Sequence, residues 1–129
     1  MVTVSLERLR SRIETLARFG ALPGGGVTRP CWSPPHEEAR AWLLGELRGA
    51  GLEAWVDPAG NVFGGTGARG FRPDAPVVLT GSHIDTVPEG GILDGALGVL
   101  AGLDALQTIR ERGIPHRRPL AVAAWSDEE

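Results

Sequence analysis

Two apolar runs separated by a helical pattern decide the fold. Residues 76–80 read Pro-Val-Val-Leu-Thr, and residues 120–125 read Leu-Ala-Val-Ala-Ala-Trp. Continuous apolar runs of this length are typical of strands that are buried on both faces of a parallel sheet. Between the runs, apolar residues including Leu97, Leu100 and Ile109 follow helical spacing over about residues 95–112. The order strand, helix, strand predicts a βαβ unit with two parallel neighbouring strands, and therefore an α/β fold.

The preceding part of the chain predicts two more helices and a hairpin. Helical spacing covers residues 4–19, where Ser5 is placed to cap the first turn, and about residues 36–48, where Gly51 is placed to end the helix. Glycines and prolines between residues 20 and 35 indicate a loop. Residues 52–56 and 61–64 read as short strands around a tight turn, and a Gly/Arg/Pro-rich loop follows to residue 75.

Composition indicates one ordinary globular domain. The chain has 129 residues, of which 42% are hydrophobic and 22% are charged, with a net charge of -3. This balance provides no basic footprint for nucleic acid or anionic lipid, and no apolar run has the length of a membrane span or the pattern of a signal peptide. Cys31 is the single cysteine, so we expect no intrachain disulfide, an inert thiol and a cytoplasmic location.

Ionisable side chains gather where the two buried strands end. His83 and Asp85 follow the first run, Glu128 and Glu129 follow the second, and Asp94 stands at the start of the crossover helix. In open parallel sheets ligands bind at the carboxyl ends of the strands, so these five side chains should converge. Carboxylates that converge repel one another unless cations neutralise them, and imidazole with carboxylates suits Zn²⁺, Mn²⁺ or Co²⁺.

Each residue taken singly also has a structural explanation. His83 fits a polar loop, Asp94 fits a helix cap, and Glu128 with Glu129 fits a frayed chain end. Their shared place at one sheet edge is what favours a metal site.

Three motifs carry a resemblance to a known family. They are Gly-Ser-His-Ile-Asp-Thr-Val-Pro at residues 81–88, Gly-Gly-Ile-Leu-Asp-Gly-Ala-Leu-Gly-Val-Leu at residues 90–100, and Ser-Asp-Glu-Glu at residues 126–129. The chain resembles the two-metal aminoacylase and carboxypeptidase-like amidohydrolases, and within them most of all the N-carbamoyl-L-amino-acid and allantoate amidohydrolases. Residues 25–29 and 57–63 share the likeness, which covers nearly the whole chain.

The resemblance implies a role for each of the five residues. Asp94 would bridge two divalent ions, zinc or manganese and possibly cobalt, with His83 on one ion and Glu129 on the other. Asp85 would orient or polarise a ligand. Glu128 would be the catalytic base that takes a proton from the attacking water. The peptide bond after the bridging Asp94 is a candidate cis bond.

The resemblance also implies a larger parent enzyme. Residues 1–129 would be the N-terminal part of a three-layer α/β/α zinc-exopeptidase-like catalytic domain, without the lid and dimerisation domain and the C-terminal part. We expect that the parent hydrolyses carbamoyl or ureido bonds of small amino-acid-like substrates and forms a homodimer. We expect that the isolated chain is inactive, and that its last strand, residues 120–125, lacks some neighbouring strands, which favours self-association. Two alternatives stay open: an N-acyl-amino-acid hydrolase or dipeptidase, and a non-catalytic fold with a vestigial metal site.

Overall fold

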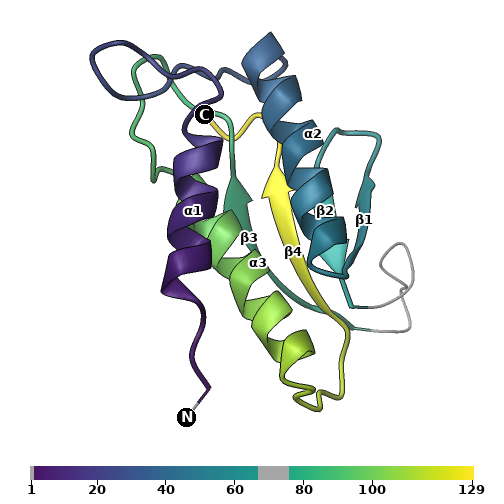
Figure 1. Cartoon of the computed structure of the whole chain (residues 1–129). Coiled ribbons are helices and arrows are strands. Elements are labelled where there is room, and N and C mark those ends of the chain that lie inside the picture. Colours follow the sequence, from purple (N-terminus) through teal and green to yellow (C-terminus); the bar gives the residue numbers. More distant parts are fainter. Residues whose placement is uncertain (1, 67–75) are drawn as a thin grey trace.

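The computed structural model describes residues 2–66 and 76–129 (Figure 1). Its elements in order are α1 (Leu6–Leu16), α2 (Pro34–Gly49), β1 (Glu53–Val56), β2 (Val62–Gly65), β3 (Val78–His83), α3 (Ala96–Glu111) and β4 (Leu120–Trp125). Most of the loop expected up to residue 75 lies outside the described residues. In the part of the chain that is described, no helix has the length and apolar character needed to cross a membrane.

The strands form one mixed sheet in the order β1-β2-β4-β3. The neighbours β3 and β4 are parallel, in a register that runs from Val78 opposite Leu120 to His83 opposite Trp125. Since α3 connects them, the predicted βαβ unit is confirmed. The β1–β2 hairpin adds antiparallel strands on the other side of β4. The fold class is α/β, as predicted.

Two expectations about the strands were wrong. β3 was expected to be buried on both faces, yet Val78 and Leu79 are 52% and 40% exposed, because within the described residues β3 is the edge of the sheet. β4 was expected to lack some of its neighbours and to leave an unpaired edge, yet it lies between β2 and β3 and its four central residues are buried. The hairpin folds back onto β4, and local sequence carries no sign of that long-range pairing.

The three helices of the described residues lie on one face of the sheet (Figure 1). α2 and α3 pack on the strands, and α1 packs on α3. Apolar side chains from these helices and from the near face of β4 form the core, including Leu16, Leu43, Leu47, Val99, Leu100, Leu103 and Val122. The described residues therefore form two layers, a four-stranded sheet and the helices that cover one of its faces.

Local capping explains where α1 begins and where α2 ends. The Ser5 side chain accepts a hydrogen bond from the Arg8 amide at 3.2 Å, as predicted for the start of α1. α2 ends where Gly51 adopts a φ of 76°, and the Leu52 amide donates to the Leu47 carbonyl at 3.1 Å. This pairing is the Schellman arrangement, in which glycine takes the left-handed position.

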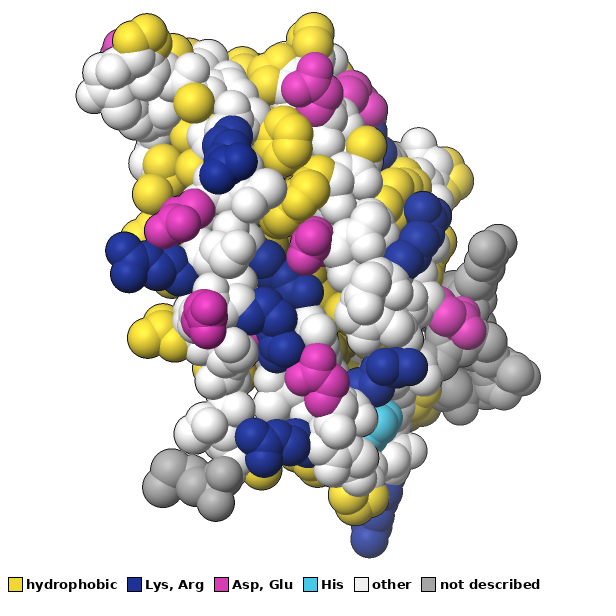
Figure 2. All heavy atoms as spheres, in the orientation of Figure 1, with side chains coloured by type: hydrophobic (Ala, Val, Ile, Leu, Met, Phe, Trp, Pro, Cys, Tyr) yellow, Lys and Arg dark blue, Asp and Glu magenta, His cyan; other side chains and the backbone are white. Residues whose placement is uncertain are grey.

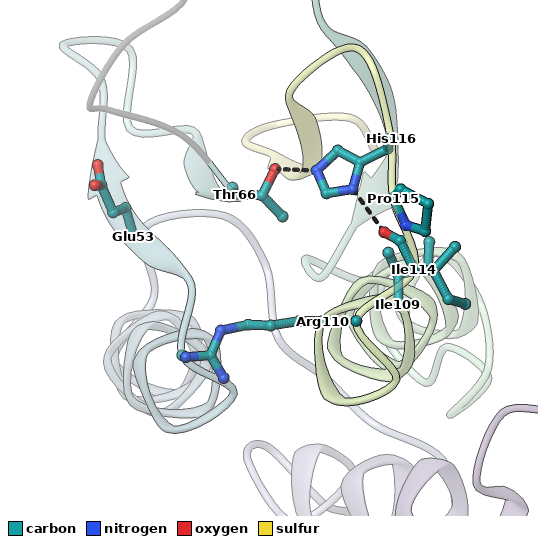
Figure 3. Close-up of a pocket in the computed structure, with 10 residues that line it drawn as sticks. Glu53, Thr66, Ile109, Arg110, Ile114, Pro115 and His116 are labelled. Carbon is teal, nitrogen blue, oxygen red and sulfur yellow. Dashed lines mark hydrogen bonds between the residues drawn. The ribbon is translucent and has the colours of Figure 1, made fainter.

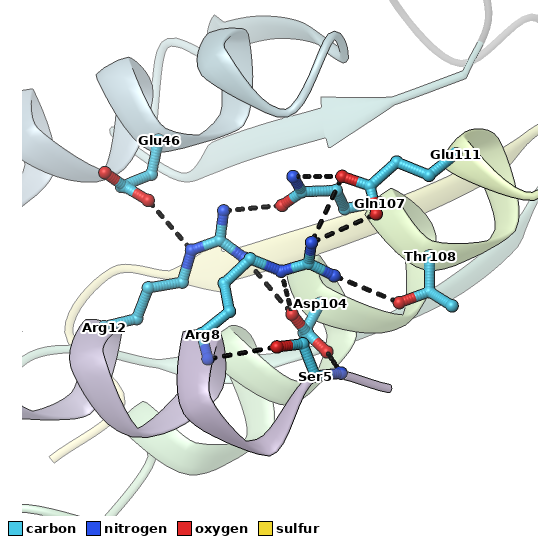
Figure 4. Close-up of polar contacts among 8 residues, drawn as sticks. All are labelled: Ser5, Arg8, Arg12, Glu46, Asp104, Gln107, Thr108 and Glu111. Carbon is cyan, nitrogen blue, oxygen red and sulfur yellow. Dashed lines mark hydrogen bonds and ion pairs between the residues drawn. The ribbon is translucent and has the colours of Figure 1, made fainter. Parts of the chain in front are cut away.

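A polar network fixes α1 on the other two helices (Figure 4). The Asp104 carboxylate on α3, fully buried, accepts from the Ser5 amide at 3.0 Å and from the Arg8 guanidinium. Arg12 donates to Glu46 of α2 at 2.8 Å and to Gln107 of α3 at 2.7 Å. Arginines and acidic side chains accordingly intermingle on the helical face of the molecule (Figure 2). These contacts hold the helical layer together away from the ends of the strands.

Candidate metal centre

The candidate centre stands at the edge where β3 and β4 end, beside the C end of the chain in Figure 1. His83 is the last residue of β3, because the parallel ladder runs two residues beyond Gly81. Glu128 and Glu129 follow β4, and Asp94 precedes Gly95, the N-cap residue of α3. Parallel pairing therefore brings three separate segments to one edge of the sheet.

Three of the predicted residues offer ligand atoms to a common point. One ring nitrogen of His83 and one carboxylate oxygen each from Asp94 and Glu129 lie within 4.8 Å of one another. His83 Nε2 is 3.9 Å from Asp94 Oδ1 and 3.3 Å from Glu128 Oε2. The imidazole is buried, whereas the Asp94 and Glu128 side chains are 60% and 54% exposed. The centre is thus a buried nitrogen facing an open rim of carboxylates.

The hydrogen bonding of His83 suits metal binding. Its Nδ1 lies 3.0 Å from the backbone carbonyl oxygen of Asp85. A carbonyl oxygen only accepts, so in the neutral tautomer that binds a metal the proton is assigned to Nδ1 and the lone pair to Nε2. That lone pair faces Asp94 and Glu128. One neutral imidazole nitrogen and several carboxylate oxygens form a donor set that fits zinc or manganese.

Asp85 connects the segments that follow the two strands. Its side chain is 1% exposed, and Oδ2 accepts from the backbone amides of Glu128 at 3.1 Å and Glu129 at 3.3 Å. Oδ1 lies 3.5 Å from His83 Nδ1, too far for a good hydrogen bond, and has no hydrogen-bond partner among the described residues. The imidazole is therefore oriented by the backbone of Asp85, and the acidic pair by its side chain.

A second anchor, Asn61, holds the segment after β4 and was not singled out from the sequence. Asn61 Oδ1 accepts from the Ser126 amide at 2.9 Å, while the Asn61 amide groups donate to the Asp57 carboxylate. The next residue, Asp127, has a φ of 60°, which turns the chain so that Glu128 and Glu129 come back toward the edge. Non-glycine residues in this region are uncommon and often found at functional sites.

Gly95 gives His83 its space. Its φ is 61°, and a Cβ at this position would lie 2.5 Å from His83 Nε2. The Asp94–Gly95 peptide, expected as a candidate cis bond, is trans. Glycine adopts a positive φ at little steric cost, so the chain turns here with a trans peptide bond. No side-chain hydrogen bond caps α3, so the structure does not use Asp94 as the cap.

Arg29 lies beneath the centre and was assigned no role from the sequence. It is 1% exposed, and its guanidinium donates to the carbonyl oxygens of Ile84, Leu16 and Phe19. Burial lowers the pKa of Arg29 to about 10, although the nearby Asp85 raises it. At neutral pH the Arg29 side chain is therefore a cation. It lies against the backbone that carries His83 and Asp85.

The surroundings of Cys31, the single cysteine, agree with the expectation of an inert thiol. Burial raises the pKa of Cys31, and the Asp85 and Asp127 carboxylates raise it as well, although hydrogen bonds from the backbone of Asp127 and Trp32 lower it. A raised pKa reduces the thiolate fraction at neutral pH, so Cys31 is a poor nucleophile.

A separate hollow lies far from the candidate centre. Its volume is about 560 Å³, and it opens between Glu53, Thr66, Arg110 and His116 (Figure 3). The His116 ring contacts Thr66 Oγ1 at 3.4 Å and the Ile114 carbonyl at 3.1 Å. This hollow borders the end of α3, whereas Asp94 precedes its start, and a helix of that length spans about 24 Å. The two sites are separate.

Comparison with known proteins shows a family to which the chain is similar. Residues 79–129 match the model of peptidase family M20/M25/M40. The chain is 44% identical over 123 residues to an N-carbamoyl-L-amino acid amidohydrolase of Geobacillus stearothermophilus, covering 95% of this chain and 30% of that protein. It is 42% identical over 117 residues to the allantoate amidohydrolase of Bacillus subtilis, covering 90% and 28%.

The solved structures agree. A hydantoinase/carbamoylase family amidase from Burkholderia ambifaria superposes with a TM-score of 0.91 at 37% identity, covering all of this chain and 31% of that one. The chain thus spans about 30% of the length of the curated relatives it matches. The matched segment, residues 79–129, holds all five residues of the candidate centre, and over this segment the chain is similar to the M20/M25/M40 peptidase family.

Proposed function

We propose that this chain carries the metal-binding edge of an amidohydrolase that cleaves linear carbamoyl or ureido C–N bonds of small amino-acid-like substrates. The observation that carries the proposal is the meeting of His83, Asp94 and Glu129 within 4.8 Å at the sheet edge. The names of the relatives support the choice of bond, since they include N-carbamoyl-L-amino acid and allantoate amidohydrolases. We expect the protein to act in the cytoplasm.

The residues divide into ligands, a base and a support. His83, Asp94 and Glu129 would hold two divalent ions, zinc or manganese, and Asp94 would be the ligand common to both. When bound, the ions polarise the scissile carbonyl and activate the attacking water. Glu128, whose Oε2 stands 3.3 Å from His83 Nε2, accepts the proton from that water and passes it to the leaving nitrogen. Asp85 fixes the backbone of both glutamates through Oδ2.

The base works only in combination with further groups. Catalytic zinc usually has three protein ligands, and three side chains shared by two ions fall short of that number. The described edge is also open, with its carboxylates exposed, so it does not exclude water from a substrate. We therefore propose that residues beyond these 129 complete the ligand set and enclose the substrate, and that the isolated chain has no useful turnover.

Turnover measurements test this proposal. We would assay N-carbamoyl-amino acids, allantoate and N-acetyl-amino acids with Mn²⁺ or Zn²⁺, using the 129-residue chain and a fusion to the remaining part of the Geobacillus stearothermophilus relative. The expected result is turnover of the carbamoyl substrates by the fusion alone, lost in Glu128→Gln. Near-native turnover by the 129-residue chain contradicts the proposal that further residues complete the ligand set. Activity that survives Glu128→Gln shows that the base is misassigned.

The same assay separates the alternatives. Preference for N-acetyl-amino acids or dipeptides over carbamoyl substrates indicates an N-acyl-amino-acid hydrolase or dipeptidase. A folded fusion that binds the ions and turns over none of these substrates indicates a non-catalytic fold with a vestigial metal site.

A further inference from the structure

We propose that Arg29 is a positioning residue for the candidate metal centre, which it supports by clamping the backbone on both sides of Asp85. The inference rests on the metal centre proposed above for its function, and on contacts within this chain for its geometry. Arg29 lies in the loop between α1 and α2, 54 residues before His83 in sequence, so the clamp is a tertiary feature.

The side chain of Arg29 clamps the residue before Asp85. Nε donates to the Ile84 carbonyl at 2.6 Å, and one terminal nitrogen donates to the carbonyls of Leu16 at 2.9 Å and Phe19 at 2.8 Å. Leu16 is the last residue of α1, and Ile84 follows the last residue of β3. One guanidinium therefore ties the end of a helix to the end of the strand that carries His83.

The backbone of Arg29 clamps the residue after Asp85. The Arg29 amide donates to Thr86 Oγ1 at 2.8 Å, and the Thr86 amide donates to the Arg29 carbonyl at 2.9 Å. Asp85 itself is thereby left with its carboxylate directed at the amides of Glu128 and Glu129. A loosening at Arg29 would reach both groups that Asp85 orients.

The chemistry of Arg29 separates it from an ordinary buried arginine. Its guanidinium, 1% exposed, makes its hydrogen bonds to three neutral carbonyls, whereas Arg12 is bonded to Glu46 and Gln107 in the helical network (Figure 4). Burying a charge without a directly bonded carboxylate is costly, and apolar replacements of buried charges are often at least as stable. Rigid three-point positioning is a gain that an apolar side chain does not supply, and lysine lacks the planar fork.

A metal-free measurement tests the clamp first. We would record amide hydrogen exchange for the wild type, Arg29→Met, Arg29→Lys and the matched control Arg12→Met. In both Arg29 variants the amides of Thr86, Glu128 and Glu129 are expected to lose about tenfold or more of their protection relative to Ala123 in β4. Arg12→Met is expected to lower protection without singling out this turn. Wild-type relative protection of the turn in the Arg29 variants overturns the inference.

Metal affinity is the second measurement. Titration calorimetry with Mn²⁺ is expected to show affinity weakened about tenfold or more in Arg29→Met, within the usual range for groups that orient ligands, and by less in Arg29→Lys. Arg12→Met should bind as the wild type does. Equal affinity in the Arg29 variants and Arg12→Met overturns the inference. A wild type that binds no Mn²⁺ contradicts the proposed metal centre instead, and hydrogen exchange then decides the role of Arg29. If Arg29→Met fails to fold, Arg29→Lys decides both measurements.

Discussion

Among single residues, Asp94 differs from the other proposed ligands because it alone is expected to contact both ions. A ligand that binds only the native state at a hundred times its Kd stabilises the native state by about 2.7 kcal/mol. Saturating Zn²⁺ or Mn²⁺ should therefore raise the Tm of the wild-type chain. Asp94→Ala should abolish the rise, whereas His83→Ala and Glu129→Ala should each leave part of it, as measured by thermal unfolding with and without the ion.

Glu53→Ala serves as the control for this series, since Glu53 is an exposed carboxylate that pairs through Gly65 with Ala121, at the end of the sheet opposite His83. It should keep the full metal-dependent rise. Equal rises in the wild type and Asp94→Ala would contradict the bridging role.

His36 makes stability depend on pH. It is 1% exposed, and its Nδ1 accepts from the Trp32 amide at 3.1 Å, a bond that requires the neutral ring. Burial lowers its pKa below 6.5, with Arg40 and Arg29 contributing and Asp85 and Glu37 opposing. The unfolded chain therefore binds the proton more readily, so the free energy of unfolding should fall as pH decreases through 6.5 and level off below the folded pKa.

Urea unfolding between pH 7.5 and 5.5 measures this effect. His36→Asn keeps an acceptor at the same place but does not titrate. As the pH falls, the free energy of unfolding of the wild type should decrease relative to that of His36→Asn. Parallel pH profiles would show that His36 has the same pKa in both states.

The residues of the candidate centre could be predicted because they follow strands, and Arg29 could not. His83, Asp85, Glu128 and Glu129 stand where two apolar runs end, which is visible in one dimension. Arg29 donates hydrogen bonds to the backbone carbonyls of Leu16, Phe19 and Ile84. Every residue has a backbone carbonyl, so the sequence does not show which of them accept. The sequence shows the motif that contains Arg29, but only the folded structure shows which groups Arg29 contacts.

For an element, the end of α2 provides a sharp comparison between two glycines. Gly51 has a φ of 76° in the Schellman turn, and a Cβ there would meet the Arg110 guanidinium at 2.3 Å. Gly45 lies within α2 with nothing within 4 Å of an added Cβ. Gly51→Ala should lower the free energy of unfolding by about 1–2 kcal/mol because alanine is strained at left-handed φ. Gly45→Ala should raise it by about 0.5–1 kcal/mol through helix propensity.

Chemical denaturation of both variants checks this pair. Stabilisation by Gly51→Ala would mean that α2 ends without the left-handed turn.

Element boundaries show what local pattern leaves out. The β4 run from Leu120 to Trp125 was predicted with its observed limits, because a strand paired on both sides needs an apolar run. The pattern of β3 looks the same, yet its first residues are exposed. Apolar composition reports what a segment can bury, and only the strand order decides what covers it. α1 is shorter than the helix over residues 4–19 that the periodicity predicts. Part of the reason is that the carbonyls of Leu16 and Phe19 accept hydrogen bonds from Arg29.

For the whole molecule, one face of the sheet carries no helix of the described residues and β3 is the edge strand among them, and both features favour self-association. Trp55, Phe63 and Trp125 form one ring cluster there, with centroids 5.4 and 5.6 Å apart between successive rings, and Trp125 is 39% exposed. Leu79 pairs in register with Ala121 on the same side. We expect the 129-residue chain to associate at micromolar concentration, and Leu79→Lys to shift it toward monomer, because a lysine on an edge strand opposes pairing.

Sedimentation velocity across a concentration series measures this shift. Leu6→Lys is the control, since Leu6 is 76% exposed but lies on α1, away from the sheet. A monomer at all concentrations, or an equal effect of both lysines, would contradict association through the sheet.

The contacts of Asp85 also set an order of assembly. The three proposed ligands stand 11 and 35 residues apart in sequence, and Asp85 reaches amides that lie 43 and 44 residues further along the chain. No short stretch of the unfolded chain therefore gathers a chelating set, and premature capture of an ion by the nascent polypeptide is disfavoured. The site comes into being only when β4 docks beside β3, so metal loading should report the closing of the βαβ crossover and follow folding in time rather than guide it.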